Sequence, residues 1–95
     1  MTDTEKEDEF LQQLTKDYLR DMLIELRSVE VKVSRREGEV LAAFGHTLKG
    51  SGSMFGFPEI TQLGLQIEEE AQAEHWDGVM ETTRKLIAVI EKLLQ

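Results

Sequence analysis

The sequence from Leu41 to Pro58 reads LAAFGHTLKGSGSMFGFP and holds one of the two histidines, four of the seven glycines and the only proline. Its large apolar residues recur at steps of three, four and seven: Leu41, Phe44, Leu48 and Phe55. This spacing predicts a helix with one face in a hydrophobic core. At about 100° per residue, His46 falls on the opposite face. The helix therefore buries its large residues and presents a histidine to solvent.

Small and cationic residues surround His46 on that outer face: Ala42, Ala43, Lys49, Gly50 and Ser53. A glycine inside a helix costs about 1 kcal/mol relative to alanine, so Gly50, one turn after His46, indicates that the imidazole needs open access. Lys49 places a positive charge where an anion on the ring would sit. An accessible imidazole beside a cation is suited to nucleophilic attack on phosphorus.

The hexapeptide HTLKGS at residues 46–51, with Gly56 ten residues after the histidine, resembles the phosphorylation motif of histidine phosphotransfer (HPt) domains. The N-terminal domain of chemotaxis histidine kinases is similar. The resemblance covers about residues 8–94, nearly the whole chain. It implies a four-helix module in which His46 is the phosphorylated nucleophile. We therefore expect residues 1–7 to form a solvated acidic tail and residues 8–95 a single HPt-like domain.

The composition limits the class of protein. Ninety-five residues with a single proline and few aromatic side chains favour one small all-helical domain. A net charge of −8 argues against nucleic acid and against an anionic membrane surface as partners. The chain has no cysteine, and no apolar run approaches the roughly 20 residues of a membrane span. We expect a soluble cytoplasmic protein.

Helical periodicity predicts four helices, over about residues 8–31, 35–54, 58–73 and 76–94. Short connections between them favour an all-α, antiparallel up-down-up-down four-helix bundle. The segment from Ser34 to Glu37 fits a capping box that opens the second helix. Alternating valines at positions 29, 31 and 33 leave open a short strand, although the rest of the chain offers it no partner strand.

In the first predicted helix, Leu11 and Leu14 belong to the apolar residues that recur at helical spacing. At the end of the second predicted helix, Met54 and Phe55 are expected in the core and at its edge. Ser51 and Gly52, on the inner side of the same helix, are expected to permit tight helix packing.

Glu68 lies on the flank of the third predicted helix, within the run Glu68–Glu70. Such a run is usually a solvated charged face, and we expect that role for the other two residues. In HPt domains, however, the position 22 residues after the histidine often holds a glutamine or glutamate bonded to the imidazole. The resemblance therefore implies that Glu68 contacts His46, fixes its tautomer and leaves the other ring nitrogen as a neutral nucleophile.

Three further residues have weaker assignments. Leu65 falls on the outward side near Glu68 and could belong to a docking patch. Ser53 could bond to a phosphoryl oxygen. His75 has no cysteine or second histidine at metal-ligand spacing, so we expect no metal site.

The resemblance implies a phosphocarrier in a two-component phosphorelay. His46 would accept a phosphoryl group from a receiver-domain aspartate and pass it to another receiver, with response regulators or hybrid histidine kinases as partners. No Gly-rich loop follows a strand, so the chain has no ATP site of its own and is not an enzyme by itself. We expect a monomer without a cofactor, with Mg²⁺ on the receiver.

Other functional classes remain open. The chain could be the phosphoacceptor domain of a chemotaxis-type kinase, cut from a longer protein, or a non-catalytic helical scaffold that binds a receiver. A metal-dependent bundle enzyme would need facing Glu-x-x-His pairs, and the sequence contains none.

Overall fold

A computed structural model describes residues 2–95, in which every regular element is a helix. The helices are α1 (Asp3–Arg27), α2 (Val29–Ser34), α3 (Gly38–Phe55), α4 (Pro58–Gln72) and α5 (Trp76–Leu93). The predicted all-α class is therefore confirmed. The alternating valines lie in α2, so the alternative of a short strand is wrong. Met1, part of the predicted tail, lies outside the described residues.

The first predicted helix is two helices in the structure, α1 and α2, separated at Ser28. The Ser28 hydroxyl donates to the Glu25 carbonyl at 2.7 Å, which competes with regular helical bonding. The start of α1 also lies earlier than predicted. A capping box closes it, because the Glu5 amide donates to the Thr2 hydroxyl and the Thr2 amide donates to the Glu5 carboxylate, both at 3.2 Å. Residues 3–7, expected as a solvated tail, are exposed and helical.

The capping box predicted at Ser34 is wrong. The Ser34 hydroxyl donates to the Val31 carbonyl at 2.6 Å and so belongs to the end of α2. Arg36 then takes a left-handed backbone conformation with φ of 56°, and α3 begins at Gly38 without a side-chain cap. The Ser34 hydroxyl therefore bonds within the last turn of α2 and does not cap α3. The chain turns at Arg36 before α3 begins.

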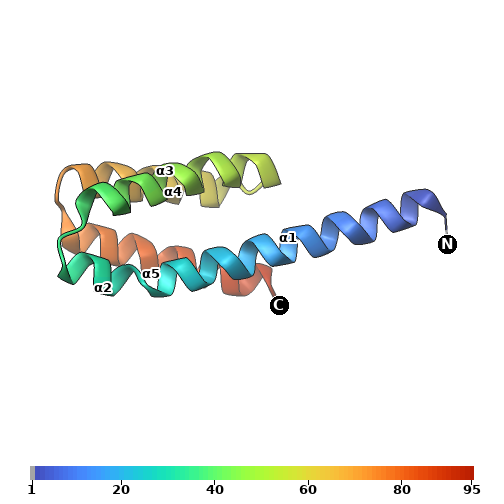
Figure 1. Cartoon of the computed structure of the whole chain (residues 1–95), viewed down its shortest axis with the longest axis horizontal. Coiled ribbons are helices and arrows are strands. Elements are labelled where there is room, and N and C mark those ends of the chain that lie inside the picture. The colour runs from blue at the N-terminus through green and yellow to red at the C-terminus, as the bar shows by residue number, and fades with distance from the viewer. Residues whose placement is uncertain (1) are drawn as a thin grey trace.

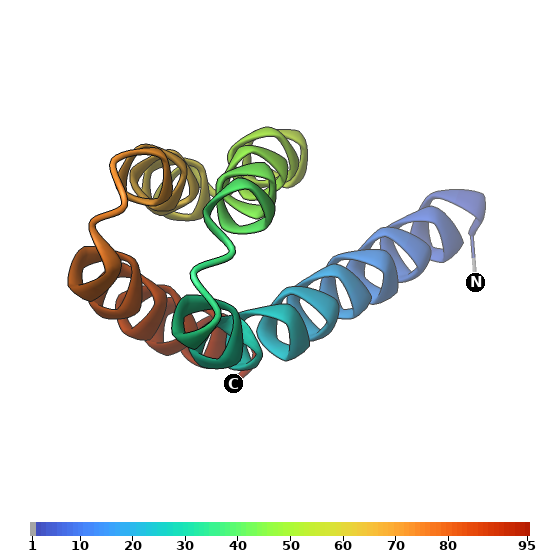
Figure 2. The ribbon, with the colours of Figure 1, turned by 60° about the vertical axis from the view of Figure 1, so that its left-hand side comes forward.

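The chain reverses direction at each end of the bundle (Figure 1). It runs along α1 and α2 to one end and returns along α3. It then runs back along α4 and returns again along α5. The closest helix pair is α3 with α4, while α5 packs against α4, α1 and α2. Figure 2 shows the first turns of α1 extending away from the other helices, and the longest dimension of the molecule is 51 Å.

Two clusters of buried side chains form the core. The larger contains Tyr18, Leu19, Leu26, Leu48, Ile60, Ile67, Leu86 and Ile90. The smaller, at the α2 end, contains Val29, Val33, Leu41, Ala71 and Val79. Burial of this apolar surface supplies the main driving force for folding.

A polar contact inside the core ties α1 to α3. The Tyr18 ring stacks on Phe55 with a centroid distance of 4.2 Å and an interplanar angle of 8°. Its hydroxyl lies 2.7 Å from Ser51 Oγ. Burial raises the pKa of Tyr18, and the hydrogen bond with Ser51 opposes this shift. This contact holds the middle of α1 against the helix that carries His46.

One core assignment is wrong. Met54 is 82% exposed, because it lies on the outer side of α3 at the last turn of the helix. Leu11 and Leu14, which recur at helical spacing, are also exposed, at 57% and 44%. Their part of α1 extends beyond the other helices of residues 2–95 (Figure 1). Phe55 is partly buried, as expected at the edge of the core.

The turn between α3 and α4 agrees with the sequence. Gly56 has a left-handed backbone with φ of 79° and caps α3, and Pro58 occupies the first turn of α4. The observed ends of α4 and α5 lie within one residue of those predicted.

Candidate functional site

Glycines bring α3 and α4 unusually close beside His46. A Cβ atom on Gly45 would lie 2.5 Å from the Glu68 amide nitrogen, and one on Gly64 would lie 2.7 Å from Leu48 Cβ. Real Cβ atoms essentially never approach other heavy atoms below 3.0 Å. Both positions therefore require glycine for this packing, and the close approach brings the Glu68 backbone next to the helix of His46.

Glu68 contacts the imidazole directly. Its Oε2 lies 3.0 Å from His46 Nδ1, so the expected contact is present. Because an ionised carboxylate can only accept, Nδ1 carries the hydrogen and donates it. The side chain of Glu68 is 16% exposed, whereas that of His46 is 67% exposed. The carboxylate thus orients the ring from below, and Nε2 keeps its lone pair for solvent or a partner.

Lys49 approaches the same carboxylate. Its Nζ lies 3.8 Å from Glu68 Oε1, while Oε2 holds His46. Glu68 of α4 therefore contacts both His46 and Lys49 of α3. The sequence predicted both residues near His46, but it did not predict that they contact each other. The Lys49 ammonium is partly exposed and 3.8 Å is near the outer limit of an ion pair, so Lys49 can exchange this contact for a stronger anion.

The surface around His46 is open. A Cβ atom added to Gly50 would meet no other atom within 4 Å, and Ala43, Ser53 and Leu65 are exposed. Ala42 is half-buried and lines a groove of about 380 Å³ between the start of α3 and the end of α4. The accessible imidazole therefore stands on a helix surface with small neighbours, where another folded domain could approach it.

Residues on the inner side of α3 hold this helix against α4 and α1. Gly52 is buried, and a Cβ atom there would lie 2.7 Å from the Thr61 amide nitrogen of α4. Ser51 is half-buried and contacts Tyr18. Both residues lie on the inner side of α3, as expected.

One residue of the acidic run differs from expectation. Glu70 is half-buried and accepts a hydrogen bond from Thr82 Oγ1 at 2.6 Å, which joins α4 to α5. A side chain at Gly78 would collide with this carboxylate. Glu70 follows Ile67 by three residues and Leu63 by seven, which is the spacing of the buried stripe and could have identified its inward position. Glu69 is exposed, as predicted.

His75 is exposed and precedes the first turn of α5. Within residues 2–95, no group of three or more His, Cys, Asp or Glu side chains is placed to hold a metal ion. In the same range, no helix combines the length and apolar character needed to cross a membrane.

The site is therefore an exposed imidazole on one helix of a small helical bundle, oriented by a carboxylate of the adjacent helix. The Hpt domain family matches residues 8–95, and the chain belongs to this family. Comparisons with curated proteins and with solved structures gave no match.

Family membership establishes the general function of the chain. Hpt domains act in histidine phosphotransfer within two-component signalling, and they are phosphocarriers rather than conventional enzymes. They interact with receiver domains and histidine kinases. The match covers nearly all of the chain, so the general function of the family applies to the chain as a whole.

Proposed function

We propose that this domain carries a phosphoryl group on His46 between two receiver domains. The observation that supports the proposal is the 3.0 Å contact between His46 Nδ1 and Glu68, which leaves Nε2 free on an exposed ring. The donor is the aspartyl phosphate of one receiver, and the acceptor is the aspartate of another. The receivers belong to response regulators or hybrid histidine kinases.

The transfer step follows from the tautomer. The Nε2 lone pair of His46 attacks phosphorus, the N–P bond forms, and the P–O bond to the receiver's aspartate breaks to release a carboxylate. The ring becomes cationic as the bond forms, because Nδ1 keeps its hydrogen. Glu68 accepts that hydrogen bond and stabilises the positive charge. The second transfer is the reverse of this step on another receiver.

Lys49 acts on the product state. Phosphorylation adds about −1.5 to −2 charge at neutral pH, to a chain with a net charge of −8. Lys49 is one turn from His46 and turns from Glu68 toward the phosphoryl oxygens. The chain supplies no cofactor in this scheme, and Mg²⁺ is bound by the receiver.

The receiver docks over the outer surface of α3 and the adjacent flank of α4. Ala42, Ala43, Gly50 and Ser53 provide the low surface around His46, and Leu65 adds an apolar contact. The domain works as a monomer with an antiparallel up-down-up-down arrangement, and the alternating course of the chain in Figure 1 supports this arrangement. Because transfer needs in-line geometry, the domain contributes mainly by positioning.

A panel of phosphorylated receivers tests the proposal. At least one should transfer radiolabelled phosphate to the chain, and the label should be acid-labile and base-stable, as expected for a phosphoramidate. His46→Gln should abolish labelling, and the matched control His75→Gln should keep it. Label on His46→Gln would show that another residue is the acceptor. Binding of a receiver without any transfer would favour the scaffold alternative.

A further inference from the structure

The first turns of α1 carry an apolar stripe that no other helix of residues 2–95 covers. Phe10 is 65% exposed, Leu11 is 57% exposed and Leu14 is 44% exposed. Leu11 and Leu14 precede Tyr18 by seven and four residues, so they continue the stripe that enters the core at Tyr18. The first turns of α1 extend beyond the ends of the other helices, as Figure 1 and Figure 2 show.

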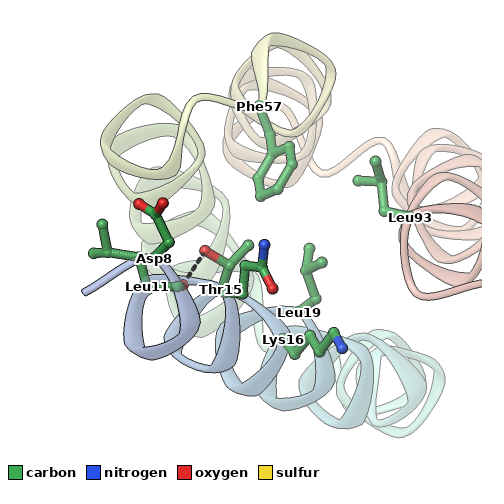
Figure 3. A pocket seen from close by; sticks show the side chains of 8 residues that line it. Asp8, Leu11, Thr15, Lys16, Leu19, Phe57 and Leu93 are labelled. Atoms are coloured by element: carbon green, nitrogen blue, oxygen red, sulfur yellow. Dashed lines mark hydrogen bonds between the residues drawn. The ribbon is translucent and has the colours of Figure 1, made fainter. Parts of the chain in front are cut away.

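A groove lies at the base of this overhang. Its volume is about 430 Å³, and its apolar floor consists of Leu11, Leu19, Phe57 and Leu93. Figure 3 shows Phe57 and Leu93 pointing from the turn before α4 and from the end of α5 into the space above Leu19. Asp8 and Lys16 stand at its polar edge. α1, α5 and Phe57 thus form an open apolar groove that continues onto the exposed stripe of α1.

The overhang is strongly acidic. Residues 3–9 contain five carboxylates and one lysine: Asp3, Glu5, Glu7, Asp8 and Glu9, with Lys6. Glu7 precedes Leu11 and Leu14 by four and seven residues and therefore lies on the apolar stripe itself. A ligand that packs on the leucines must approach these carboxylates.

We propose that this open end is a docking site for an amphipathic helix of a partner protein, with apolar side chains on one face and Lys or Arg beside them. The apolar face would cover Leu11, Leu14 and the floor at Phe57. The cationic flanks would pair with the carboxylates of residues 3–9. The overhang from Asp3 to Leu14 is about 18 Å long, which accommodates roughly three helical turns.

A second copy of the chain fits this site less well. Each copy would bring its own five carboxylates and a net charge of −8 to the contact, so two overhangs packed against each other would place like charges face to face. Charge complementarity therefore selects a basic partner.

Docking here leaves the phosphorylation site accessible. Phe55 follows His46 by nine residues, which places the end of α3 about 14 Å along the helix from the imidazole. The inference goes beyond the proposed phosphotransfer, because it describes a tether to a partner rather than a contact at the reacting atoms. Its failure would leave the assignment of His46 intact.

The experiment uses a synthetic helical peptide of about 14 residues with leucines on one face and lysines beside them. In one control peptide glutamate replaces the lysines, and in another serine replaces the leucines. Binding to the ¹⁵N-labelled protein is followed by chemical shifts. Leu11→Ser with Leu14→Ser is compared with Ile24→Ser, which alters another exposed apolar residue of the same helix (67% exposed) away from the groove.

The leucine–lysine peptide should shift residues around the groove, and the double serine variant should weaken its binding about tenfold or more. Ile24→Ser should bind like the parent, and all variants should keep the parent's circular dichroism spectrum and labelling of His46. Equal binding by the two variants would overturn the proposal. So would equal binding of either control peptide, an absence of peptide binding, or a dimer in sedimentation equilibrium that disappears in the double serine variant.

Discussion

At the scale of single residues, some residues of the site orient the imidazole of His46 and others leave it accessible. His46 and Glu68 share a 3.0 Å contact, and the carboxylate is largely shielded while the imidazole is exposed. Gly50 touches nothing on the side where a partner would approach. We therefore expect stability and transfer to depend on different residues around His46, so that substitutions separate the two.

Gly50→Gln should slow phosphotransfer sharply, because the new side chain extends over the imidazole. The bundle should be as stable as the parent or slightly more so, since a helical glycine costs about 1 kcal/mol. Urea denaturation and receiver-to-protein transfer rates measure the two effects. Equal transfer rates in variant and parent would remove Gly50 from the mechanism.

Lys49 and Glu68 should affect different states of His46. Lys49→Ala should shift the transfer equilibrium back toward the receiver by about fivefold, because an exposed charge-assisted contact is worth about 1 kcal/mol. Glu68→Ala should slow phosphorylation with less effect on the equilibrium, and Glu68→Gln should be mild because it keeps an acceptor. Forward and reverse transfer with one receiver distinguish these roles. The opposite result for the two alanine variants would reverse the assignment.

At the scale of elements, the α3–α4 pair is the part of the fold on which the site depends. Gly45 and Gly64 allow the two backbones to meet, and this approach sets the distance between His46 and Glu68. The Glu70–Thr82 bond holds the other side of α4 against α5. The α3–α4 packing therefore contributes both to stability and to the orientation of the imidazole.

Gly64→Ala should destabilise the bundle and slow transfer, because its Cβ would lie 2.7 Å from Leu48 Cβ and from the Lys49 amide nitrogen. Overpacking of this kind typically costs about 1–3 kcal/mol. Gly50→Ala is the matched control, since it has free space and should gain about 1 kcal/mol from helix propensity. Thermal and urea denaturation measure both variants. A stabilised Gly64→Ala protein with normal transfer would show that the close approach is unnecessary.

At the scale of the whole molecule, a buried phenol links α1 to the bundle and makes stability depend on alkaline pH. The raised pKa of Tyr18 means that the folded state holds its proton more tightly than the unfolded state, whose reference value is 10.0. Its contribution is therefore fully present below pH 10 and is lost as the pH rises through the folded pKa.

Tyr18→Phe keeps the ring next to Phe55 but cannot ionise. At pH 8 it should lose about 1 kcal/mol, because the 2.7 Å hydrogen bond between the phenol and Ser51 Oγ is lost. Between pH 8 and 11 it should lose less stability than the parent, and urea denaturation at both pH values measures the difference. Parallel loss of stability in both proteins would show that Tyr18 makes no alkaline contribution.

Local pattern was enough to predict the all-helical class, the ends of α4 and α5, and the outward position of His46. The helical class and the outward position of His46 follow from 3.6-residue periodicity, and the start of α4 follows from the backbone conformations of Gly56 and Pro58. Both depend only on residues that are close in sequence. The position of Glu68 came from a family resemblance and not from local pattern. The break at Ser28 and the use of Ser34 to end α2 were missed, because a serine hydroxyl can bond either forward or backward along the chain.

Tertiary packing decided the rest. Leu11 and Leu14 have the apolar character of core residues, yet they are exposed because no other helix of residues 2–95 lies opposite the first turns of α1. Glu70 has the spacing of the inward stripe, but its hydrogen bond with Thr82 depends on α5 lying opposite that position. The contact between Glu68 and Lys49 likewise depends on how closely α3 and α4 approach. Periodicity shows which way a side chain faces on its own helix, whereas burial and contact depend on which other helix lies opposite.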